Sequence, residues 1–546
     1  MQVQLRLGQA ADEPGDGRVV AGEDPGVGGG GHAASFWASV DPLYPRAWVV
    51  ARGAPPARVR STPRCGDALQ AAARPDRVDS VEREHVIYSW SAQGGIDPVR
   101  VVGGEGCWFR DSQGRRYLDF ASQVVNLNLG HGHPRLVEAL RRQAEALYGL
   151  APSFASEPRS ELARLLAEVT PGDLGMTLFT TGGADANENA VKLARWVTGR
   201  QKVVARYRSY HGATAGAAAL TGDPRRWPAE PAAPGVVRMF DPYPYRCSAG
   251  HSYDALGAHA FDPTAGHVDD CAIAAGGPHL EEILQFEGPG SVAAVILETV
   301  TGANGVLVPP PGYLASIREV CDRHGILLIL DEVMTGFGRT GRWFACEHWG
   351  VTPDIMTLAK GISGGAAPLG AVVVSEKLRP WLEEHEFASG LTACGHPLAC
   401  AAGVATVETL REERLVENAA VMGEILAAKL LELADDHTSV GEVRGLGLLW
   451  GLELVRDRET REPLVPYAAT GEAAQPMAAL RRAAMDRGLH LYVHGNLLLI
   501  APPLVVGSDE LDTGLAILDE VLAVADGFAG RGSVAGSDPA RGSGST

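Results

Sequence analysis

The sequence lacks an excess of basic charge, long apolar runs and paired cysteines, and each absence excludes a class of protein. Its 48 Lys and Arg residues stand against 66 Asp and Glu residues, a formal net charge of −18, which argues against a nucleic acid or an anionic membrane as the main partner. No apolar run approaches the roughly 18 residues that cross a bilayer, and the N-terminus lacks the apolar core of a secretory signal. The eight scattered cysteines include no CxxC pair and no zinc-site spacing. We therefore expect a reduced, cytoplasmic protein without a metal site.

The 546 residues, 45% of them hydrophobic, are enough for a large core and more than one domain. The first part of the chain is rich in Gly, Ala, Pro and Arg and has neither a strand nor a helix periodicity, so we predict that residues 1–80 are a disordered extension. Residues 527–546 have the same character and are predicted to be a disordered tail. The folded part is therefore expected at 81–526.

Apolar strand-like runs alternate with amphipathic helical runs through the middle of the chain. The predicted strands lie at residues 175–180, 202–207, 291–297, 325–330, 355–358 and 370–374, and the clearest helices lie at 185–197 and 314–324. Near-continuous apolar strands between helices predict an α/β fold with a mostly parallel central sheet that helices cover on both faces. Residues 246–278, rich in His, Gly and Asp, are interpreted as a long surface loop, because their Cys and His spacings fit no metal site.

Two predicted strands lead into residues of opposite charge. Asp331 follows the apolar run GILLIL, where an ionised carboxylate needs a cation or several hydrogen-bond donors, and strand alternation puts Val333 on the same face. Lys360 stands at the end of another apolar strand, where its ammonium form is disfavoured and the neutral amine becomes nucleophilic. For each residue taken alone, the alternatives are a helix-capping aspartate and a lysine that reaches the surface.

A glycine turn and an aromatic pair add to this pattern. Gly182 and Gly183 lie between a predicted strand and a predicted helix, where free backbone N–H groups and the helix dipole can bind a phosphate. Tyr210 and His211 follow the next strand and could stack on a planar ring. Each signal is weak alone, because glycine turns are common and a lone tyrosine is more often a core residue.

In chain order these features are a phosphate turn, a stacking aromatic, a strand-end Asp and a strand-end Lys, which is the set that a pyridoxal phosphate site needs. Asp331 would keep the ring nitrogen protonated, and Lys360 would form a Schiff base with the cofactor and then move the substrate proton. The stretches FTTGGADANENAVKLAR, SYHG, ILLILDEVMTGFGRTG, DIMTLAKGISGG and GLTACGHPLACAAG resemble the class III (omega) aminotransferases of fold type I, over 81–526. The resemblance is closest to the taurine–pyruvate and other omega-amino-acid transaminases.

This resemblance implies a pyridoxal 5′-phosphate cofactor and a role for each matching residue. Lys360 would bind the cofactor covalently, Asp331 would pair with its ring nitrogen, and Glu298 would support that pair. The other residues implied to bind the cofactor are Gly182, Gly183 and Ala184 at the phosphate, Val333 and Tyr210 on the two faces of the ring, His211 beside Tyr210, and Thr392 at the phosphate of the partner subunit. Tyr88 and Trp90 would line the substrate pocket.

The family also implies how the chain is divided and assembled. A large cofactor-binding domain is expected at 151–395, and a smaller α+β domain is expected from 81–150 together with 396–526. Because Thr392 would complete the site of a partner, the resemblance implies a homodimer or a tetramer.

The substrate side departs from the family pattern. No arginine stands between Gly488 and the Pro502-Pro503 pair, where many relatives hold a carboxylate, and the chain offers His494 instead, a residue charged only part of the time near pH 7. We identify no second cation for a dicarboxylate. We therefore expect amines or ω-amino acids as donors and a small 2-oxo acid such as pyruvate as acceptor. Arg444 is the alternative clamp.

Two other functions stay open at this point. Another fold type I reaction, by an aminomutase, a racemase or a decarboxylase, would share the same cofactor site. A non-catalytic regulator that binds the cofactor would instead need a fused basic DNA-binding domain, and residues 1–80 contain no helix-turn-helix pattern.

Overall fold

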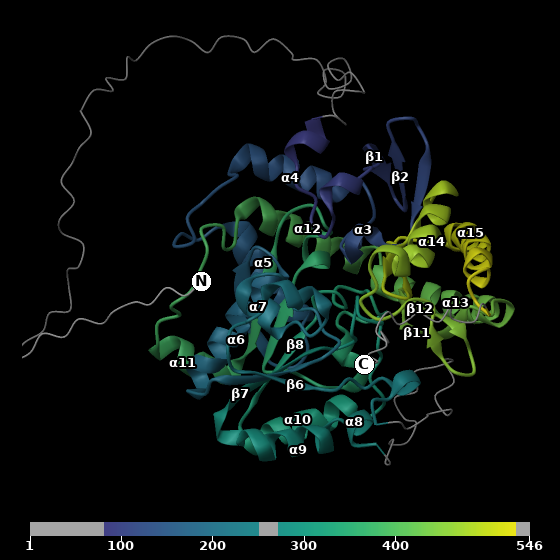
Figure 1. Ribbon diagram of the computed structural model, residues 1–546. Coiled ribbons are helices and arrows are strands. Elements are labelled where there is room, and N and C mark those ends of the chain that lie inside the picture. Colours follow the sequence, from purple (N-terminus) through teal and green to yellow (C-terminus); the bar gives the residue numbers. More distant parts are fainter. Residues whose placement is uncertain (1–80, 250–270, 531–546) are drawn as a thin grey trace, which may run out of the picture. The chain divides into compact units, whose positions relative to one another are not determined.

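The computed structural model describes residues 81–249 and 271–530, so the predictions for residues 1–80 and 531–546 lie outside the described residues. A seven-stranded sheet has the order β4-β10-β9-β8-β7-β5-β6 (Figure 1). Its strands are β4 (Leu174–Thr180), β5 (Lys202–Arg206), β6 (Val236–Met239), β7 (Val292–Glu298), β8 (Leu327–Asp331), β9 (Ile355–Leu358) and β10 (Gly370–Ser375). Neighbouring strands are parallel except at β10, which is antiparallel to β4 and β9. The mostly parallel sheet is confirmed.

Side chains of the central sheet pack into two apolar layers, because successive residues of a strand point to opposite faces. Val203 and Ala205 of β5 lie in the layer that contains α6 (Gly183–Thr198), whereas Val204 between them lies in the larger core. That larger core also contains residues of α5 (Glu157–Val169), α9 (Gly277–Glu287), α10 (Tyr313–His324) and α12 (Pro397–Glu412). Helices therefore cover both faces of the sheet, as its apolar strands predict.

A second region is built from both ends of the described chain. One sheet contains β1 (Val101–Glu105), β2 (Trp108–Asp111), β3 (Arg116–Asp119) and β14 (Leu489–His490). In it, β14 from the C-terminal part pairs in parallel with β3 from the N-terminal part. The other sheet contains β11 (Val440–Leu446), β12 (Leu449–Asp457), β13 (Glu462–Pro463), β15 (Tyr492–His494) and β16 (Leu497–Ile500).

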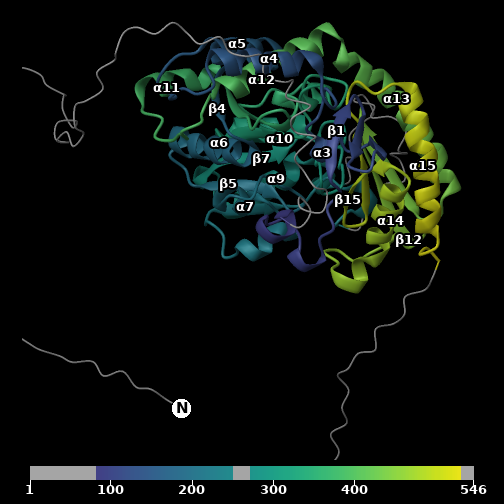
Figure 2. The ribbon, with the colours of Figure 1, turned by 90° about the horizontal axis from the view of Figure 1, so that it is seen from above.

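Three helices accompany these two sheets. They are α13 (Leu415–Asp436), α14 (Gln475–Asp486) and α15 (Ser508–Asp526), and they lie on the same side of the molecule as β11 and β12 (Figures 1 and 2). A smaller α+β region from the N- and C-terminal parts is therefore confirmed. The domain boundaries at 150 and 396 stay predictions.

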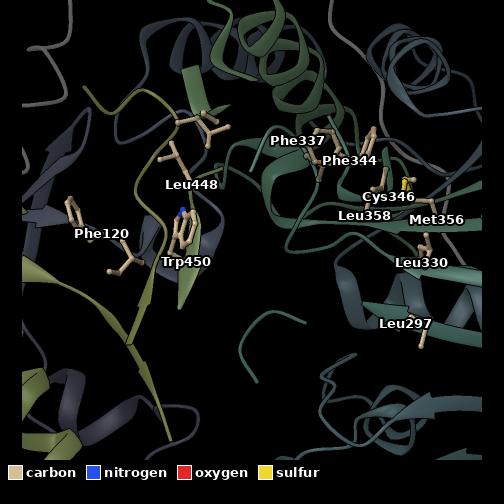
Figure 3. Packing of buried hydrophobic residues seen from close by; sticks show 14 of the residues in the cluster. Phe120, Leu297, Leu330, Phe337, Phe344, Cys346, Met356, Leu358, Leu448 and Trp450 are labelled. Carbon is tan, nitrogen blue, oxygen red and sulfur yellow. The ribbon is translucent and has the colours of Figure 1, made fainter. Parts of the chain in front are cut away.

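One apolar core connects the two regions. It contains Leu297, Leu330, Met356 and Leu358 of the central sheet together with Phe120, Leu448 and Trp450 of the second region (Figure 3). Phe337 and Phe344 belong to the same core and pack edge to face, with ring centroids 5.5 Å apart. The two regions therefore share one close-packed interior rather than having separate cores.

Three details differ from the sequence predictions. β6 is absent from the predicted strands, because it has only four residues and Arg238 interrupts its apolar pattern. β8 begins at Leu327 rather than at Gly325, since Gly325 has φ 59° and ends α10 in the left-handed conformation. The loop predicted at 246–278 is partly helical, because α8 (Ala272–Ala275) and the start of α9 lie within it.

The remaining helices are α3 (Ser122–Val125), α4 (Pro134–Ala146), α7 (Ala215–Leu220) and α11 (Arg379–Glu384). α4, α5 and α12 pack side by side (Figures 1 and 2). Within the described ranges, no helix combines the length and the apolar character that a membrane span requires.

Candidate active site

The carboxyl ends of the parallel strands meet at one edge of the central sheet and surround a cavity of about 550 Å³. The predicted site residues that line it are Gly182, Gly183, Ala184, Tyr210, His211, Glu298, Asp331, Val333 and Lys360. The predicted residues outside the lining are Tyr88, Trp90, Thr392 and His494. The structure thus brings the expected cofactor residues of one chain together, with Thr392 apart from them, and it leaves the expected substrate residues outside the wall.

The turn from β4 into α6 forms one end of the cavity. α6 begins at Gly183, so its first backbone N–H groups have no partner within the helix. A Cβ on Gly183 would lie 3.0 Å from both methyl carbons of Val333, so glycine alone lets the backbone come this close to Val333. Thr181 N donates to Asp185 Oδ2 at 3.0 Å and closes the turn. Backbone donors with a helix dipole behind them fit a phosphate group.

Asp331 is buried at the end of β8, and neighbours hold both of its carboxylate oxygens. Asn187 Nδ2 donates to Oδ2 at 2.7 Å, and His211 Nδ1 lies 2.8 Å from the same oxygen. Val333 N donates to Oδ1 at 3.0 Å. This arrangement fixes the direction of a buried negative charge, which suits a protonated ring nitrogen placed in the cavity.

Two members of this network were not found from the sequence. Asn187 lies in α6 one turn after Gly183, and its side chain also donates to His211 O at 2.8 Å. Thr357 of β9 donates from Oγ1 to Asn187 Oδ1 at 2.7 Å and orients that amide. The signal available in the sequence was the helical spacing of Asn187 from the glycine turn, which places both on one face of α6.

His211 was predicted, with Tyr210, to stack on a planar ring, and in the structure its imidazole contacts Asp331. Its side chain is fully buried and turned toward Asp331, and no hydrogen-bond partner for its Nε2 is found in the described part of the chain. The ring therefore contacts the carboxylate, and both His211 and Tyr210 line the cavity.

Lys360 follows β9 and opens a short 3-10 helix in a left-handed backbone conformation, φ 48°. A non-glycine residue in this conformation is strained and needs support from its surroundings. Burial lowers the pKa of Lys360, although the charges of Asp331 and Glu298 oppose this shift. A lysine with a lowered pKa has more of the neutral amine that can attack a carbonyl carbon.

Glu298 connects the end of β7 to two parts of the cavity wall. Its Oε1 accepts a hydrogen bond from Tyr210 N at 2.9 Å, and its Oε2 accepts one from Gly302 N at 2.8 Å. Burial raises the pKa of Glu298, and the nearby charge of Asp331 adds to the shift. Glu298 thus positions Tyr210 and the turn that carries Ala303, which lines the cavity.

A cation missed in the sequence lies beside Tyr210, outside the residues that line the cavity. We call the group of Tyr210, Trp90 and Arg225 the mouth of the cavity. The Arg225 guanidinium stands 3.8 Å from the ring centroid of Tyr210. Asp223 is buried and holds it there, because Arg225 Nε donates to Asp223 Oδ2 at 2.8 Å. The charge of Arg225 contributes to the lowered pKa of Lys360. Arg225 stands in the stretch GDPRRW, whose sequence alone does not connect it to Tyr210.

The two candidate carboxylate clamps named from the sequence do not have the properties expected of them. Burial lowers the pKa of His494 to about 4, and the charge of Arg225 adds to this shift. His494 is therefore neutral near pH 7 rather than partly charged. Arg444 forms an ion pair with Glu453 at 2.8 Å and donates to the backbone oxygen of Gly305, so its guanidinium is already engaged.

The remaining predicted residues lie at the periphery. Trp90 is 65% exposed and packs edge-on against Tyr210, with ring centroids 6.4 Å apart. The hydroxyl of Tyr88 donates to Glu82 Oε1 at 3.1 Å. Thr392 is exposed. Among residues 81–249 and 271–530, no group of three or more His, Cys, Asp or Glu side chains is arranged to hold a metal ion.

Comparison with known proteins relates this geometry to one family. The family model for class-III aminotransferases matches residues 91–522. A solved structure of taurine:2-oxoglutarate aminotransferase from Bifidobacterium kashiwanohense, in complex with PLP and glutamate, is 42% identical with a TM-score of 0.76 and covers 83% of this chain and 98% of that one. A probable aminotransferase of Mycobacterium tuberculosis is 38% identical over 444 residues, covering 78% and 90% of the two chains. Putrescine–pyruvate aminotransferase of Pseudomonas aeruginosa is 34% identical over 427 residues, covering 76% and 88%.

Proposed function

Because this chain belongs to the class-III aminotransferases, we propose that it acts on amines and ω-amino acids and that Arg225 selects those with an acidic far end. The chain is a pyridoxal-phosphate-dependent enzyme that moves an amino group from an amine to a 2-oxo acid. The alternatives of an aminomutase, a racemase, a decarboxylase and a DNA-binding regulator find no support among these relatives.

The residues of the cavity fit the cofactor. The backbone of Gly182, Gly183 and Ala184 would bind the phosphate, and Tyr210 and Val333 would flank the ring. Pyridoxal phosphate, when bound, supplies a conjugated ring that accepts the electron pair released at the substrate carbon.

Three side chains would then do the chemical work. Asp331 would face the ring nitrogen and favour its protonated form, and Glu298 keeps Tyr210 in place through the hydrogen bond to its backbone. The neutral amine of Lys360 would hold the cofactor and would act as the base that takes the proton from the amine-bearing carbon of the substrate.

The position of Arg225 carries the substrate proposal. Its guanidinium lies over Tyr210, a residue of the cavity wall, its charge acts on Lys360, and Asp223 holds it in place. We propose that the far end of a substrate bound at Lys360 points toward it. Arginine binds carboxylates, and by the same geometry sulfonates, through paired charge-assisted hydrogen bonds. Arg225 thus supplies the cation that the sequence analysis did not identify.

Donor and acceptor occupy the same cavity in turn, so one anchor serves both. Arg225 would hold the acidic end of an ω-amino acid in the first half-reaction and the far carboxylate of a dicarboxylic 2-oxo acid in the second. Pyruvate has no far carboxylate and would bind without this contact. The two acceptors named for the relatives, 2-oxoglutarate at 42% identity and pyruvate at 34%, differ in this respect. We propose pyruvate as the basal acceptor, with 2-oxoglutarate accepted through Arg225.

The test compares acidic and neutral substrates in an Arg225→Met variant, with Arg226→Met as the matched control. Loss of an arginine–carboxylate contact, about 1.5–3 kcal/mol, should lower kcat/KM for β-alanine, taurine and 2-oxoglutarate by about tenfold to a hundredfold. The rate with a neutral amine and pyruvate should change far less, because Arg225 affects that reaction only through the pKa of Lys360. An equal loss for acidic and neutral substrates would assign Arg225 a structural role only.

We also propose that the functional unit is a homodimer, or a tetramer built from it. Val124 lines the cavity although it is 57% exposed, and Tyr148 and Phe154 expose large apolar side chains that a second copy could cover. Thr392 would then bind the phosphate of the partner. Light scattering of the active enzyme tests this assembly, and a fully active monomer would exclude it.

A further inference from the structure

Two cysteines that are distant in the sequence lie together away from the active-site cavity. Cys247 follows the short helix η3 (Pro244–Arg246), and Cys271 directly precedes α8, which Figure 1 shows beside α9 and α10. Their Sγ atoms are 3.7 Å apart, although 24 positions separate the residues. Cys271 is buried, Cys247 is partly exposed, and neither lines the cavity.

Each cysteine stands next to a segment that is anchored to another element. On one side, Arg246 forms an ion pair with Glu453 of β12, and Arg461 Nη1 donates to Tyr245 O at 2.7 Å. On the other side, Gly277 N donates to Ser316 Oγ of α10 at 2.9 Å. These contacts anchor the two segments that carry the cysteines.

We propose that Cys247 and Cys271 form a disulfide when the protein meets a small disulfide such as oxidised glutathione. The thiolate of the more exposed Cys247 attacks one sulfur of oxidised glutathione, forms a mixed disulfide and releases one glutathione. The thiolate of Cys271 then attacks Cys247 Sγ, and the second glutathione leaves. Two cysteine thiols are oxidised and one glutathione disulfide is reduced to two thiols, with both thiol protons transferred to the departing glutathiones.

The geometry allows this bond with small movements. A disulfide needs its sulfurs about 2.05 Å apart, so the two Sγ atoms must approach each other from 3.7 Å. The bond would join a segment anchored to β12 with one anchored to α10. It stabilises the folded chain by restricting the unfolded one, and it leaves the cavity unchanged.

The experiment treats the full-length holoenzyme with oxidised glutathione and counts the remaining thiols. We expect the eight thiols to fall by two and peptide mapping to find Cys247 linked to Cys271. The midpoint of thermal unfolding should rise by about 2–5 °C, with transaminase activity unchanged. Reduction with dithiothreitol should reverse both changes.

Matched variants separate this pair from the other cysteines. Cys247→Ser and Cys271→Ser should each abolish the linked peptide and the thermal shift, whereas Cys394→Ser, a change at another partly exposed cysteine, should leave both intact. A stable glutathione adduct on Cys247 in the wild type, a linked peptide between other cysteines, or an unchanged unfolding midpoint after linkage would overturn the proposal.

Discussion

The inner wall of the cavity and its mouth are built in different ways. At the inner wall, Asp331 is 4% exposed, and hydrogen bonds from Asn187, His211 and Val333 hold both of its carboxylate oxygens. At the mouth, Trp90 is mostly exposed, and a single carboxylate holds Arg225 over Tyr210. The hydrogen bonds of the inner wall thus fix its side chains in one arrangement, whereas a single residue of the mouth can be replaced without disturbing the others.

The difference has an energetic origin. A buried charge that loses a partner retains its full desolvation cost, whereas water can replace a partner at an exposed position. The inner wall can therefore support the same reaction in many relatives, and the residues of the mouth can change which substrates bind. Substitutions at the inner wall should change every reaction equally, and those at the mouth should change the ratio between substrates.

The largest effect is expected at Lys360, because the reaction with every substrate depends on its amine, whichever residues of the mouth that substrate contacts. Lys360→Ala removes the group that we propose binds the cofactor and moves the proton, so turnover should fall by about 10³-fold or more with every substrate. Initial rates measure this loss. Borohydride treatment of the wild type should modify a single peptide among the five lysines of the chain.

Lys429→Ala is the control for Lys360, since Lys429 pairs with Asp512 on the surface. It should retain the wild-type rate. Substantial turnover in Lys360→Ala, or borohydride labelling at another lysine, would remove Lys360 from the mechanism.

Asp331→Asn tests whether the inner wall acts through charge. The change is nearly isosteric, so the cofactor should still bind, but a neutral amide cannot stabilise a protonated ring nitrogen. Proton removal from the donor should slow by about 10²-fold or more, measured in a single half-reaction.

Asp354→Asn is the matched control, because Asp354 is another buried carboxylate near the central sheet, paired with Arg318 at 3.0 Å. It should lower stability and leave the half-reaction intact. A wild-type half-reaction in Asp331→Asn would contradict the proposed role of its charge.

Asn187→Ala tests whether residues that hold Asp331 also contribute to cofactor binding. Its amide donates to Asp331 at 2.7 Å, and a hydrogen bond to a charged group is worth about 1.5–3 kcal/mol, so cofactor affinity should weaken by about tenfold or more. Thr357→Val should weaken it less, because Thr357 only orients Asn187. The dissociation constant and the pH titration of the cofactor absorbance measure both effects.

Asn189→Ala provides the comparison on the same helix, since Asn189 binds Asp185 and Ser389 instead. If Asn189→Ala weakens cofactor binding as much as Asn187→Ala does, the effect belongs to α6 and not to Asp331.

The inner wall could be predicted from the sequence because its residues follow apolar strands. Five of the six predicted strands run in the same direction, so the residues after them, Asp331 and Lys360 above all, lie at one sheet edge, whereas the strand predicted at 370–374 runs the opposite way. The mouth could not be predicted in this way. Arg225 comes from a short helix between α7 and β6 and reaches Tyr210 only through the turn that Asp223 caps.

Burial also decides properties that composition does not reveal. His494 stands where a partly charged residue was expected, and the surrounding protein suppresses its charge. Asn187 stands in a stretch of the sequence that matched the family, yet its bond to Asp331 depends on how α6 packs on the sheet.

The smallest effect on catalysis is expected at His494. Burial lowers the pKa of His494 from 6.5 to about 4, so between these values the unfolded chain binds a proton that the folded chain does not. The free energy of unfolding therefore rises with pH across this window. The contribution of His494 to stability is fully present above pH 6.5 and is lost as the pH falls toward 4. The full change is on the order of 2 kcal/mol after allowance for solvent screening.

His494→Asn removes this titration, so chemical denaturation from pH 4 to 7 should show a flatter pH dependence in the variant than in the wild type. His437 is the control with the opposite sign. Burial alone would lower the pKa of His437, but hydrogen bonds to Asp526 and Asp519 raise it. The contribution of His437 to stability is therefore present at low pH and is lost as the pH rises through that raised pKa.

Between pH 7 and 8, where His494 is neutral in the wild type, His494→Asn should keep the wild-type ratio of kcat/KM for pyruvate to that for 2-oxoglutarate. A change in that ratio would mean that the mouth extends to His494, and a rate transition near pH 6.5 that disappears in the variant would mean that His494 is charged when substrate binds.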